Sequence, residues 1–148
     1  MTTTDQPASY RQPAHKVVGI LSGEWAIAVL SSLATRPHRS MELLDTINQN
    51  EERLGWTSHE RPLTRKVFHD TLKTLERDGL ITKTDRHTRF GAVWYQLTPM
   101  GHEFLRATAQ LAKLGQRYND QIDQARARFD HQANQRNERT EKPGRRTR

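Results

Sequence analysis

The segment that most constrains the fold is residues 62–101, because it predicts a helix, a strand, a turn, a second strand and another helix in direct succession. Thr64 is a favourable N-cap for the first helix, since its hydroxyl can accept a hydrogen bond from an unpaired amide of the first turn. Gly79 ends that helix, because Gly adopts the left-handed conformation common after a helix C-terminus. Three apolar residues between them recur at the spacing of one helix face: Phe68, Leu72 and Leu75.

Two short strands follow this helix. Residues 80–84 begin with apolar side chains, and residues 92–97 (AVWYQL) are rich in residues that favour strands. The polar residues 85–91 between them predict a turn, so the two strands should form a hairpin. Thr98-Pro99 then supplies an N-cap and a proline for the first position of a new helix.

Positive charge gathers on this segment. Residues 61–89 carry eight Lys or Arg and four Asp or Glu, a net charge of +4 within a chain of +7. The residues considered as DNA contacts are Thr64, Arg65, Lys66, His69 and Lys73 on the helix, and Arg86, His87 and Arg89 on the turn. Such a helix suits the major groove of duplex DNA, and the hairpin suits the neighbouring backbone or minor groove. An ordinary amphipathic helix with a solvated charged face explains the same pattern equally well.

Four pieces of the sequence, spread over about residues 14–112, carry a family resemblance. They are Gly23-Glu24-Trp25, Arg39-Ser40-Met41-Glu42-Leu43, Leu75-Glu76-Arg77-Asp78-Gly79-Leu80-Ile81 and Tyr95-Gln96-Leu97-Thr98-Pro99-Met100-Gly101. Together they resemble the winged helix-turn-helix of the HxlR family of bacterial transcriptional regulators, relatives of the MarR group. The chain departs from the family pattern at Glu24, where the family has Lys, and at Trp94, where it has Glu.

This resemblance implies a mainly α-helical fold with a small β-hairpin wing, and dimerisation through terminal helices. The helix of residues 64–77 would then lie in a major groove. Arg65, Lys66 and His69 near its start would reach base edges, where an Arg can bond both acceptors of guanine. Two subunits would read an inverted repeat with half-sites about 10 base pairs apart.

The N-terminal part predicts a flexible arm at residues 1–13, and then two short helices at residues 15–21 and 23–34. Ser22 is placed to cap the second of these helices. Trp25 at its start is interpreted as a core anchor, because a large aromatic side chain at helical spacing usually packs.

A third helix is expected from Ser40 onward. Arg39 and Ser40 at its start either contact a DNA phosphate or serve only as a cap. Residues 48–62 leave two alternatives open: the helix continues to Leu54 before a turn at Gly55, or the whole stretch is a long loop. Trp56 either braces the recognition helix or is an exposed contact.

The longest helix should begin at Pro99, with apolar side chains at heptad spacing. The residues expected to form a dimer interface are Phe104, Leu111, Tyr118, Ile122 and Phe129. Because one small domain cannot bury so long a stripe, a second copy is the expected partner. The predicted organisation is a winged helix-turn-helix domain over residues 14–129, its dimerisation helix at about 99–129, and a disordered basic tail over 130–148.

Composition excludes several classes of protein. The 148 residues suit one domain with tails, and the absence of Cys excludes disulfides, thiolate metal sites and cysteine redox sensing. With no apolar run near the ~20 residues that span a bilayer and no signal-peptide pattern, we expect a cytoplasmic, nucleoid-associated protein. The sequence lacks a phosphate loop, a nucleophile elbow and zincin-type His spacing, so we predict no enzyme activity, cofactor or metal site.

These observations favour a homodimeric transcriptional regulator, in expectation a repressor, that binds double-stranded DNA. An aromatic small-molecule effector is a further hypothesis, with Trp25, Tyr95 or Tyr118 lining its pocket. The alternative function is a winged-helix module for protein association without a specific DNA target.

Overall fold

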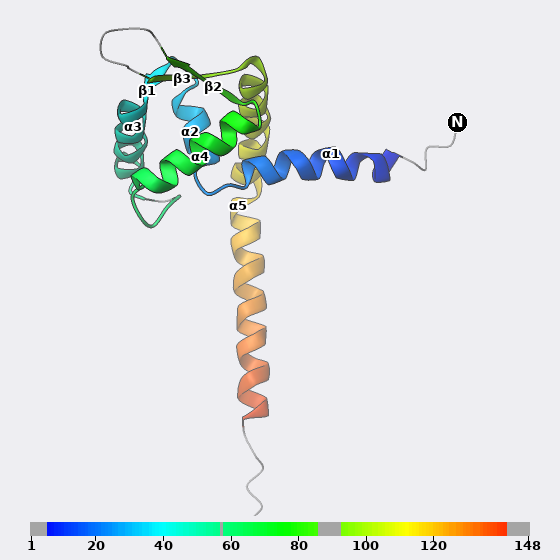
Figure 1. Cartoon of the computed structure of the whole chain (residues 1–148). Helices are drawn as coiled ribbons and strands as arrows, with labels where there is room; N and C mark the ends of the chain where they lie inside the picture. The colour runs from blue at the N-terminus through cyan, green and yellow to red at the C-terminus, as the bar shows by residue number, and fades with distance from the viewer. Residues whose placement is uncertain (1–5, 57, 86–92, 142–148) are drawn as a thin grey trace, which may run out of the picture. The chain divides into compact units, whose positions relative to one another are not determined.

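The computed structural model describes residues 6–56, 58–85 and 93–141, and it divides into a first unit up to Thr108 and a second unit from Ala109. The elements are α1 (Gln6–Leu21), α2 (Ala26–Ser32), β1 (His38–Arg39), α3 (Ser40–Arg53), α4 (Arg65–Arg77), β2 (Ile81–Asp85), β3 (Val93–Leu97) and α5 (Pro99–Thr140). The fold is thus mainly helical with one small antiparallel sheet, which confirms the predicted fold class (Figure 1).

The core of the first unit lies where α2, α3, α4 and the sheet meet. α2 contacts both α3 and α4, while α3 contacts β1 and β3, and α4 contacts β2 (Figure 1). The largest fully buried side chains come from all of these elements and their junctions: Val29, Leu30, Leu43, Ile47, Phe68, Leu72, Leu75, Leu80 and Ile81. Burying one such side chain stabilises a fold by about 1.5–3 kcal/mol, so this cluster fixes how α4 is held.

The sheet has the strand order β1-β3-β2, and both neighbouring pairs are antiparallel. Ile81 opposite Leu97 and Asp85 opposite Val93 delimit the pairing of β2 with β3, which confirms the predicted hairpin. β1 was not predicted, because two residues after a proline are too short to show a strand pattern. Its pairing with β3 places Arg39 opposite Trp94.

Both predicted ends of α4 are confirmed. Thr64 is the N-cap, and its hydroxyl accepts from the amide of Val67 at 3.4 Å. At the other end Gly79 has a φ of +82°, in the left-handed region that favours glycine. The amides of Gly79 and Leu80 donate to the carbonyls of Glu76 and Leu75 at 3.0 and 2.9 Å. This pair of bonds is the Schellman motif, which closes the helix.

Thr98 joins the end of α4 to the start of α5. Its hydroxyl donates to the carbonyl of Gly79 at 2.7 Å and accepts from the amide of Gly101 at 3.0 Å, which confirms it as the N-cap. Its own amide donates to the carbonyl of Leu80 at 3.0 Å. Gly101 comes so close to Leu80 that a Cβ at this position would overlap the Leu80 carbonyl oxygen. Only glycine fits there without a shift of backbone.

The N-terminal helix is longer than predicted. α1 begins at Gln6, so residues 6–13 are helical rather than an irregular arm. Pro7 lies in the first turn, where the missing amide hydrogen has no helical partner to lose. Pro13 lies inside the helix and removes one backbone hydrogen bond, which is why the sequence favoured a break before His15.

Two predicted caps are wrong. α2 begins at Ala26 rather than Gly23, and the hydroxyl of Ser22 donates backward to the carbonyl of Gly19 at 2.9 Å. Ser40 is the first residue inside α3, and Arg39 occupies the N-cap position. Ser hydroxyls compete for nearby carbonyls as readily as they cap, so position alone did not distinguish these roles.

The stretch after Asn48 follows the first of its two alternatives. α3 continues to Arg53 and then turns at Gly55, whose φ is +72°. Trp56 also has a positive φ, +57°, and its amide donates to the carbonyl of Glu51 at 2.9 Å. Trp56 is half-buried. Its predicted role stays a prediction.

In the second unit, α5 continues to Thr140, so the disordered tail predicted from residue 130 is wrong for residues 130–140. Six of these eleven residues are Ala, Gln, Arg or Glu, which favour a helix, and the helix breakers Pro143 and Gly144 come only later. Residues 142–148 lie outside the described part. None of the described helices is both long enough and apolar enough to cross a membrane.

We predict that Gly101→Ala destabilises the protein by roughly 3 kcal/mol, because the methyl group must displace the backbone of Leu80. Gly19→Ala is the matched control: it is also inside a helix, but a Cβ there meets no atom within 4 Å. The control should be neutral or slightly stabilising. Urea denaturation measures both variants, and equal stabilities would show that the α4–α5 junction tolerates the methyl group.

Candidate nucleic-acid interface

α4 presents its predicted polar face away from the core. Its inner side chains, Phe68, Leu72 and Leu75, are at most 2 % exposed. The side chains expected to contact DNA are all exposed: Thr64, Arg65, Lys66, His69 and Lys73. A short helix with one buried apolar face and one exposed basic face has the form of a helix that reads the major groove.

The chain just before α4 is attached to α3 by Asn48. The side-chain Nδ2 of Asn48 donates to the carbonyl of Leu63 at 3.1 Å, and its Oδ1 accepts from the Leu63 amide at 2.8 Å. Leu63 itself is buried in the core. One side chain thus satisfies both backbone groups of the residue before the Thr64 cap, which fixes where α4 begins.

His59 attaches the same connection to the start of α2. Its ring stacks on Trp25 with the centroids 3.6 Å apart and the planes within 9°. Its Nε2 lies 2.7 Å from the carbonyl oxygen of Glu24, and its Nδ1 lies 3.2 Å from Oε2 of Glu51. Because a carbonyl only accepts, Nε2 must carry a hydrogen.

The partners of His59 also set its protonation. Burial alone would lower the pKa of His59, but the Glu24 carbonyl and the Glu51 carboxylate outweigh burial and raise its pKa above the ordinary imidazole value. Glu51 is unusual as well, since it is a carboxylate only 6 % exposed at the end of α3. Buried charges in proteins are normally paired, and His59 is its ion-pair partner.

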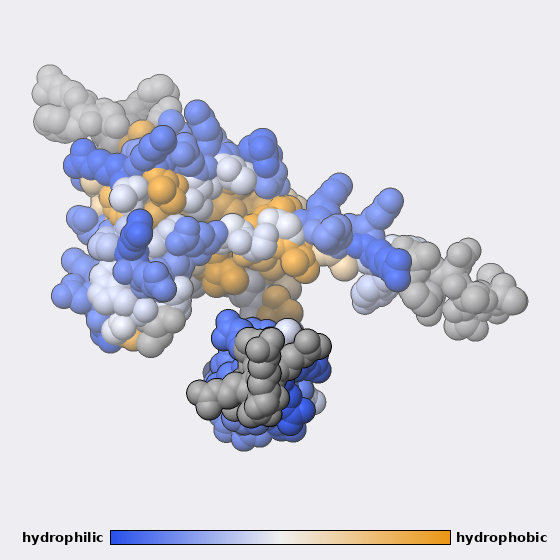
Figure 2. Space-filling model, turned by 90° about the horizontal axis from the view of Figure 1, so that it is seen from below, coloured by the Kyte–Doolittle hydropathy of each residue, from blue (hydrophilic) through white to orange (hydrophobic). Residues whose placement is uncertain are grey.

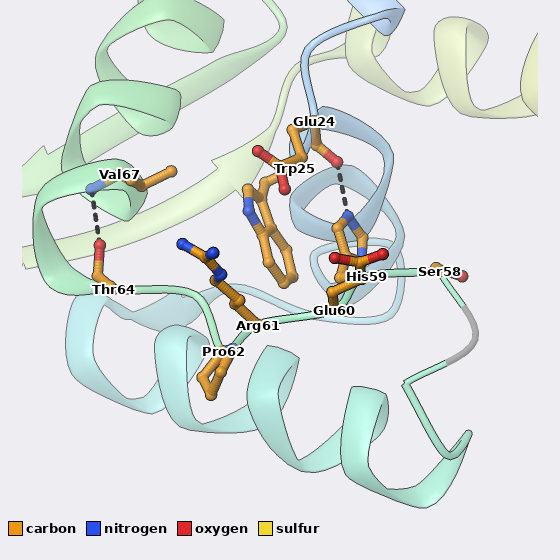
Figure 3. Close-up of a pocket in the computed structure, with 9 residues that line it drawn as sticks. All are labelled: Glu24, Trp25, Ser58, His59, Glu60, Arg61, Pro62, Thr64 and Val67. Carbon is orange, nitrogen blue, oxygen red and sulfur yellow. Dashed lines mark hydrogen bonds between the residues drawn. The ribbon is translucent and has the colours of Figure 1, made fainter.

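These residues border a cavity of about 500 Å³ beside the start of α4. Figure 3 shows Trp25 and His59 on one side of it, Thr64 and Val67 on the other, and the guanidinium of Arg61 extended between them. Arg61 was not among the predicted contacts. A cation next to the N-terminus of a groove-reading helix is suited to bind a phosphate.

Arg39 lies beside the wing strands. Its guanidinium carbon is 5.2 Å from the ring centroid of Trp94, a cation–π contact that orients an exposed cation. Ser40, beside it, is half-buried in the first turn of α3. Arg36 donates to Glu42 at 2.6 Å, and this hydrogen bond holds the pKa of the Glu42 carboxyl below its usual value. Arg36 is therefore paired with a carboxylate, whereas Arg39 lies next to the hairpin on the ring of Trp94.

The three predicted wing contacts, Arg86, His87 and Arg89, lie outside the described residues. The pairing of Asp85 with Val93 shows that β2 and β3 lead to this segment as predicted. The roles of the three residues stay predictions.

The residues predicted for an effector pocket are dispersed. Trp25 lines the cavity beside α4, whereas Tyr95 is buried in β3 and does not line it. Tyr118 belongs to the second unit. An effector site built from these three residues stays a prediction. Within residues 6–56, 58–85 and 93–141, no three His, Asp or Glu are arranged to hold a metal ion.

α3 and α4 followed by the β2–β3 hairpin define a winged helix-turn-helix protein. The family model described as HxlR-like helix-turn-helix matches residues 20–123, and the chain therefore belongs to this family. Its members are DNA-binding transcription regulators and not enzymes, so this chain is a DNA-binding transcriptional regulator.

Solved structures of regulators support this fold. A putative MarR-family regulator from Porphyromonas gingivalis W83 is 26 % identical, with a TM-score of 0.55 over 72 % of this chain and 92 % of that chain. One from Enterococcus faecalis V583 is 22 % identical, with a TM-score of 0.61 over 84 % and 97 %. The putative regulator ytfH from Salmonella typhimurium is 22 % identical, with a TM-score of 0.56 over 78 % and 91 %. No curated protein matches the chain.

We predict that Asn48→Ala destabilises the protein by about 1–3 kcal/mol, because it leaves the amide and carbonyl of Leu63 without their partner. Gln49→Ala, an exposed neighbour on α3, is the control and should change stability little. Thermal unfolding compares the two. A stability loss equal to that of Gln49→Ala would mean that the Asn48 bonds do not hold the connection.

Proposed function

We propose that the protein is a repressor that binds an inverted-repeat operator as a homodimer, with α4 of each subunit in a major groove. The exposed basic face of α4, held rigidly by its buried face, is the observation that carries this proposal. A dimer bound across two half-sites covers the DNA between them and excludes other proteins from it, which is the basis of repression. Because its target is chromosomal DNA, the protein acts at the nucleoid in the cytoplasm.

The DNA-facing residues divide into two groups by position. Arg65, Lys66 and His69 lie in the first two turns of α4, where base edges are within reach in a groove-docked helix. Lys73 lies one turn beyond His69 in α4, and Arg39 and Ser40 lie at the start of α3; these three are suited to phosphates. Arg61 joins this second group because its guanidinium lies beside the Thr64 cap (Figure 3). The wing residues Arg86, His87 and Arg89 complete the set from the sequence pattern.

The proposed dimer interface uses the terminal helices. In the second unit, α5 carries exposed apolar side chains on one stripe: Leu111, Leu114, Tyr118, Ile122 and Phe129. α1 adds Tyr10 and Val18, also exposed, and Figure 2 shows apolar surface where α1 joins the rest of the first unit. Phe104 is partly buried against the core of its own chain, so the interface depends mainly on residues from Leu111 onward. Repeated apolar side chains on an exposed helix are typical of helix–helix association.

An aromatic small molecule that tunes DNA affinity belongs to the same proposal. The cavity beside α4 supports it, because its volume of about 500 Å³ lies within the range of small-molecule sites. Trp25 is the predicted effector residue that borders this cavity. An occupant would touch both the start of α2 and the start of α4.

Selection of bound duplexes from a random DNA library tests the proposed DNA site. We predict an enriched inverted repeat for the wild type, and loss of one base preference with Arg65→Ala, worth about 1–3 kcal/mol. Arg117→Ala, an exposed arginine in the second unit, is the matched control and should enrich the wild-type motif. Absence of any enriched motif would favour the alternative, a winged-helix module for protein association.

Sedimentation tests the proposed interface. We predict that Tyr118→Ala combined with Ile122→Ala weakens the dimer by about tenfold or more, because both truncations remove buried interface area. Gln116→Ala combined with Asp120→Ala is the control: it repeats the spacing of four on the opposite face of the same helix. If the two double variants dissociate alike, or if the wild type is a monomer, the interface is elsewhere or absent.

A further inference from the structure

Both ring nitrogens of His59 face groups that only accept hydrogen bonds. Nε2 lies 2.7 Å from the Glu24 carbonyl oxygen, and Nδ1 lies 3.2 Å from a carboxylate oxygen of Glu51. A neutral imidazole carries one N–H and can therefore satisfy only one of these acceptors. Either the imidazole is doubly protonated or Glu51 is protonated and donates to Nδ1. In both cases the pair holds one proton more than a neutral imidazole beside an ionised carboxylate.

Burial makes this proton important. Oε2 of Glu51 and Nδ1 of His59 are buried and have no other hydrogen-bond partner among the described residues. At 3.2 Å their mutual contact has the geometry of an ion pair and not of a hydrogen bond, so the attraction between them is chiefly that of opposite charges. Without the proton, the lone pair of Nδ1 would face a buried carboxylate, which is unfavourable in a poorly solvated site.

The charged groups around His59 favour a cation. Glu24, just before α2, contributes its backbone carbonyl, and its side chain borders the cavity beside the start of α4. Glu51, from α3, contributes its carboxylate. Glu60 and Arg61, its neighbours in the connection, also border that cavity. Arg53 lies with Glu51 on a second hollow. At the start of α4, the uncharged cap residue Thr64 and Val67 border the cavity, while the face of Trp25 offers a cation–π contact.

We propose that His59 and Glu51 form a proton-dependent positioning pair: with the shared proton bound, residues 58–64 are held against α2 and α3, and α4 begins where it can read DNA. Loss of the proton leaves the Nδ1 lone pair facing the buried Glu51 carboxylate, so the connection keeps its bonds to Glu24 and Asn48 but is repelled from α3 at Glu51. The start of α4 then loses its fixed position, and operator affinity falls. This inference rests on the proposed DNA-binding function of α4.

The direction of the pH effect follows from the partners of His59. They raise its pKa in the folded protein. The stabilisation is therefore fully present below the ordinary imidazole pKa of about 6.5, and it is lost as pH rises through the folded-state value. Operator binding should accordingly be strongest in mildly acidic solution and weaken toward alkaline pH.

Glu51→Gln separates a positioning role from a merely structural one. The amide of Gln can donate to Nδ1 of a neutral imidazole whose Nε2 hydrogen still bonds the Glu24 carbonyl, so the connection stays closed without the extra proton. We expect the operator affinity of the wild type to fall about fivefold or more from about pH 6 to about pH 8.5. The operator affinity of Glu51→Gln should be the same at both pH values. Glu52→Gln, the same change at an exposed neighbour, should follow the wild type.

All three proteins keep His69 and His87, so titration of these residues at the DNA affects them alike. Coincident pH profiles of the wild type and Glu51→Gln would overturn the proposal. An NMR titration of the His59 ring in the free protein gives a second measurement, assigned with His59→Gln. A raised His59 pKa that Glu51→Gln lowers is expected, and an unchanged one contradicts the pairing. Because this measurement needs no DNA, it remains informative even if the protein proves to have no operator.

Discussion

The burial of one face of α4 is the constraint on which the rest of the structure depends. Phe68, Leu72 and Leu75 enter the core together, and each such burial contributes about 1.5–3 kcal/mol. Exposed ion pairs such as Arg36 with Glu42 contribute far less, because water and salt screen them. The rotation of α4 about its axis is thus set from inside, and the outward direction of Arg65, Lys66 and His69 is a consequence of it.

Fixing the rotation of α4 does not fix its position along its own axis. That position is set by the connections at its two ends. At the C-terminal end, Thr98 and Gly101 hold α5 against the Schellman turn through contacts that leave no room for a methyl group. At the N-terminal end, Asn48 and the His59–Glu51 pair hold the connection through polar contacts. Apolar packing tolerates sliding between similar shapes, whereas a hydrogen bond fixes particular atoms. Both ends of α4 are therefore fixed by hydrogen bonds, and the N-terminal end also carries the proposed base contacts.

The sequence predicted well what local chemistry decides. The cap at Thr64, the stripe of α4, the glycine turn and the hairpin each follow from residues within a few positions of one another, and all are confirmed. Contacts across the chain were not predictable in the same way. β1 exists only because β3 pairs with it, and Asn48 reaches a residue fifteen positions away. Glu51 did leave a signal, since it stands at helical spacing after Leu43, Leu44 and Ile47, where an apolar residue is expected.

The orientation of α4 and the attraction of the domain to DNA thus have different physical origins. The net charge of +4 over residues 61–89 draws the domain to a polyanion, and salt weakens this term because bound counterions are released. The core and the polar connection that orient α4 are buried, where screening by ions at a Debye length of about 8 Å has little effect. Affinity and sequence preference can therefore change separately: charge governs how tightly the domain associates with any duplex, and the placement of α4 governs which duplex fits. The proton on the His59–Glu51 pair acts on the placement of α4, and therefore on which duplex fits. Surface charges act instead on the affinity for any duplex, which is the quantity that salt also changes.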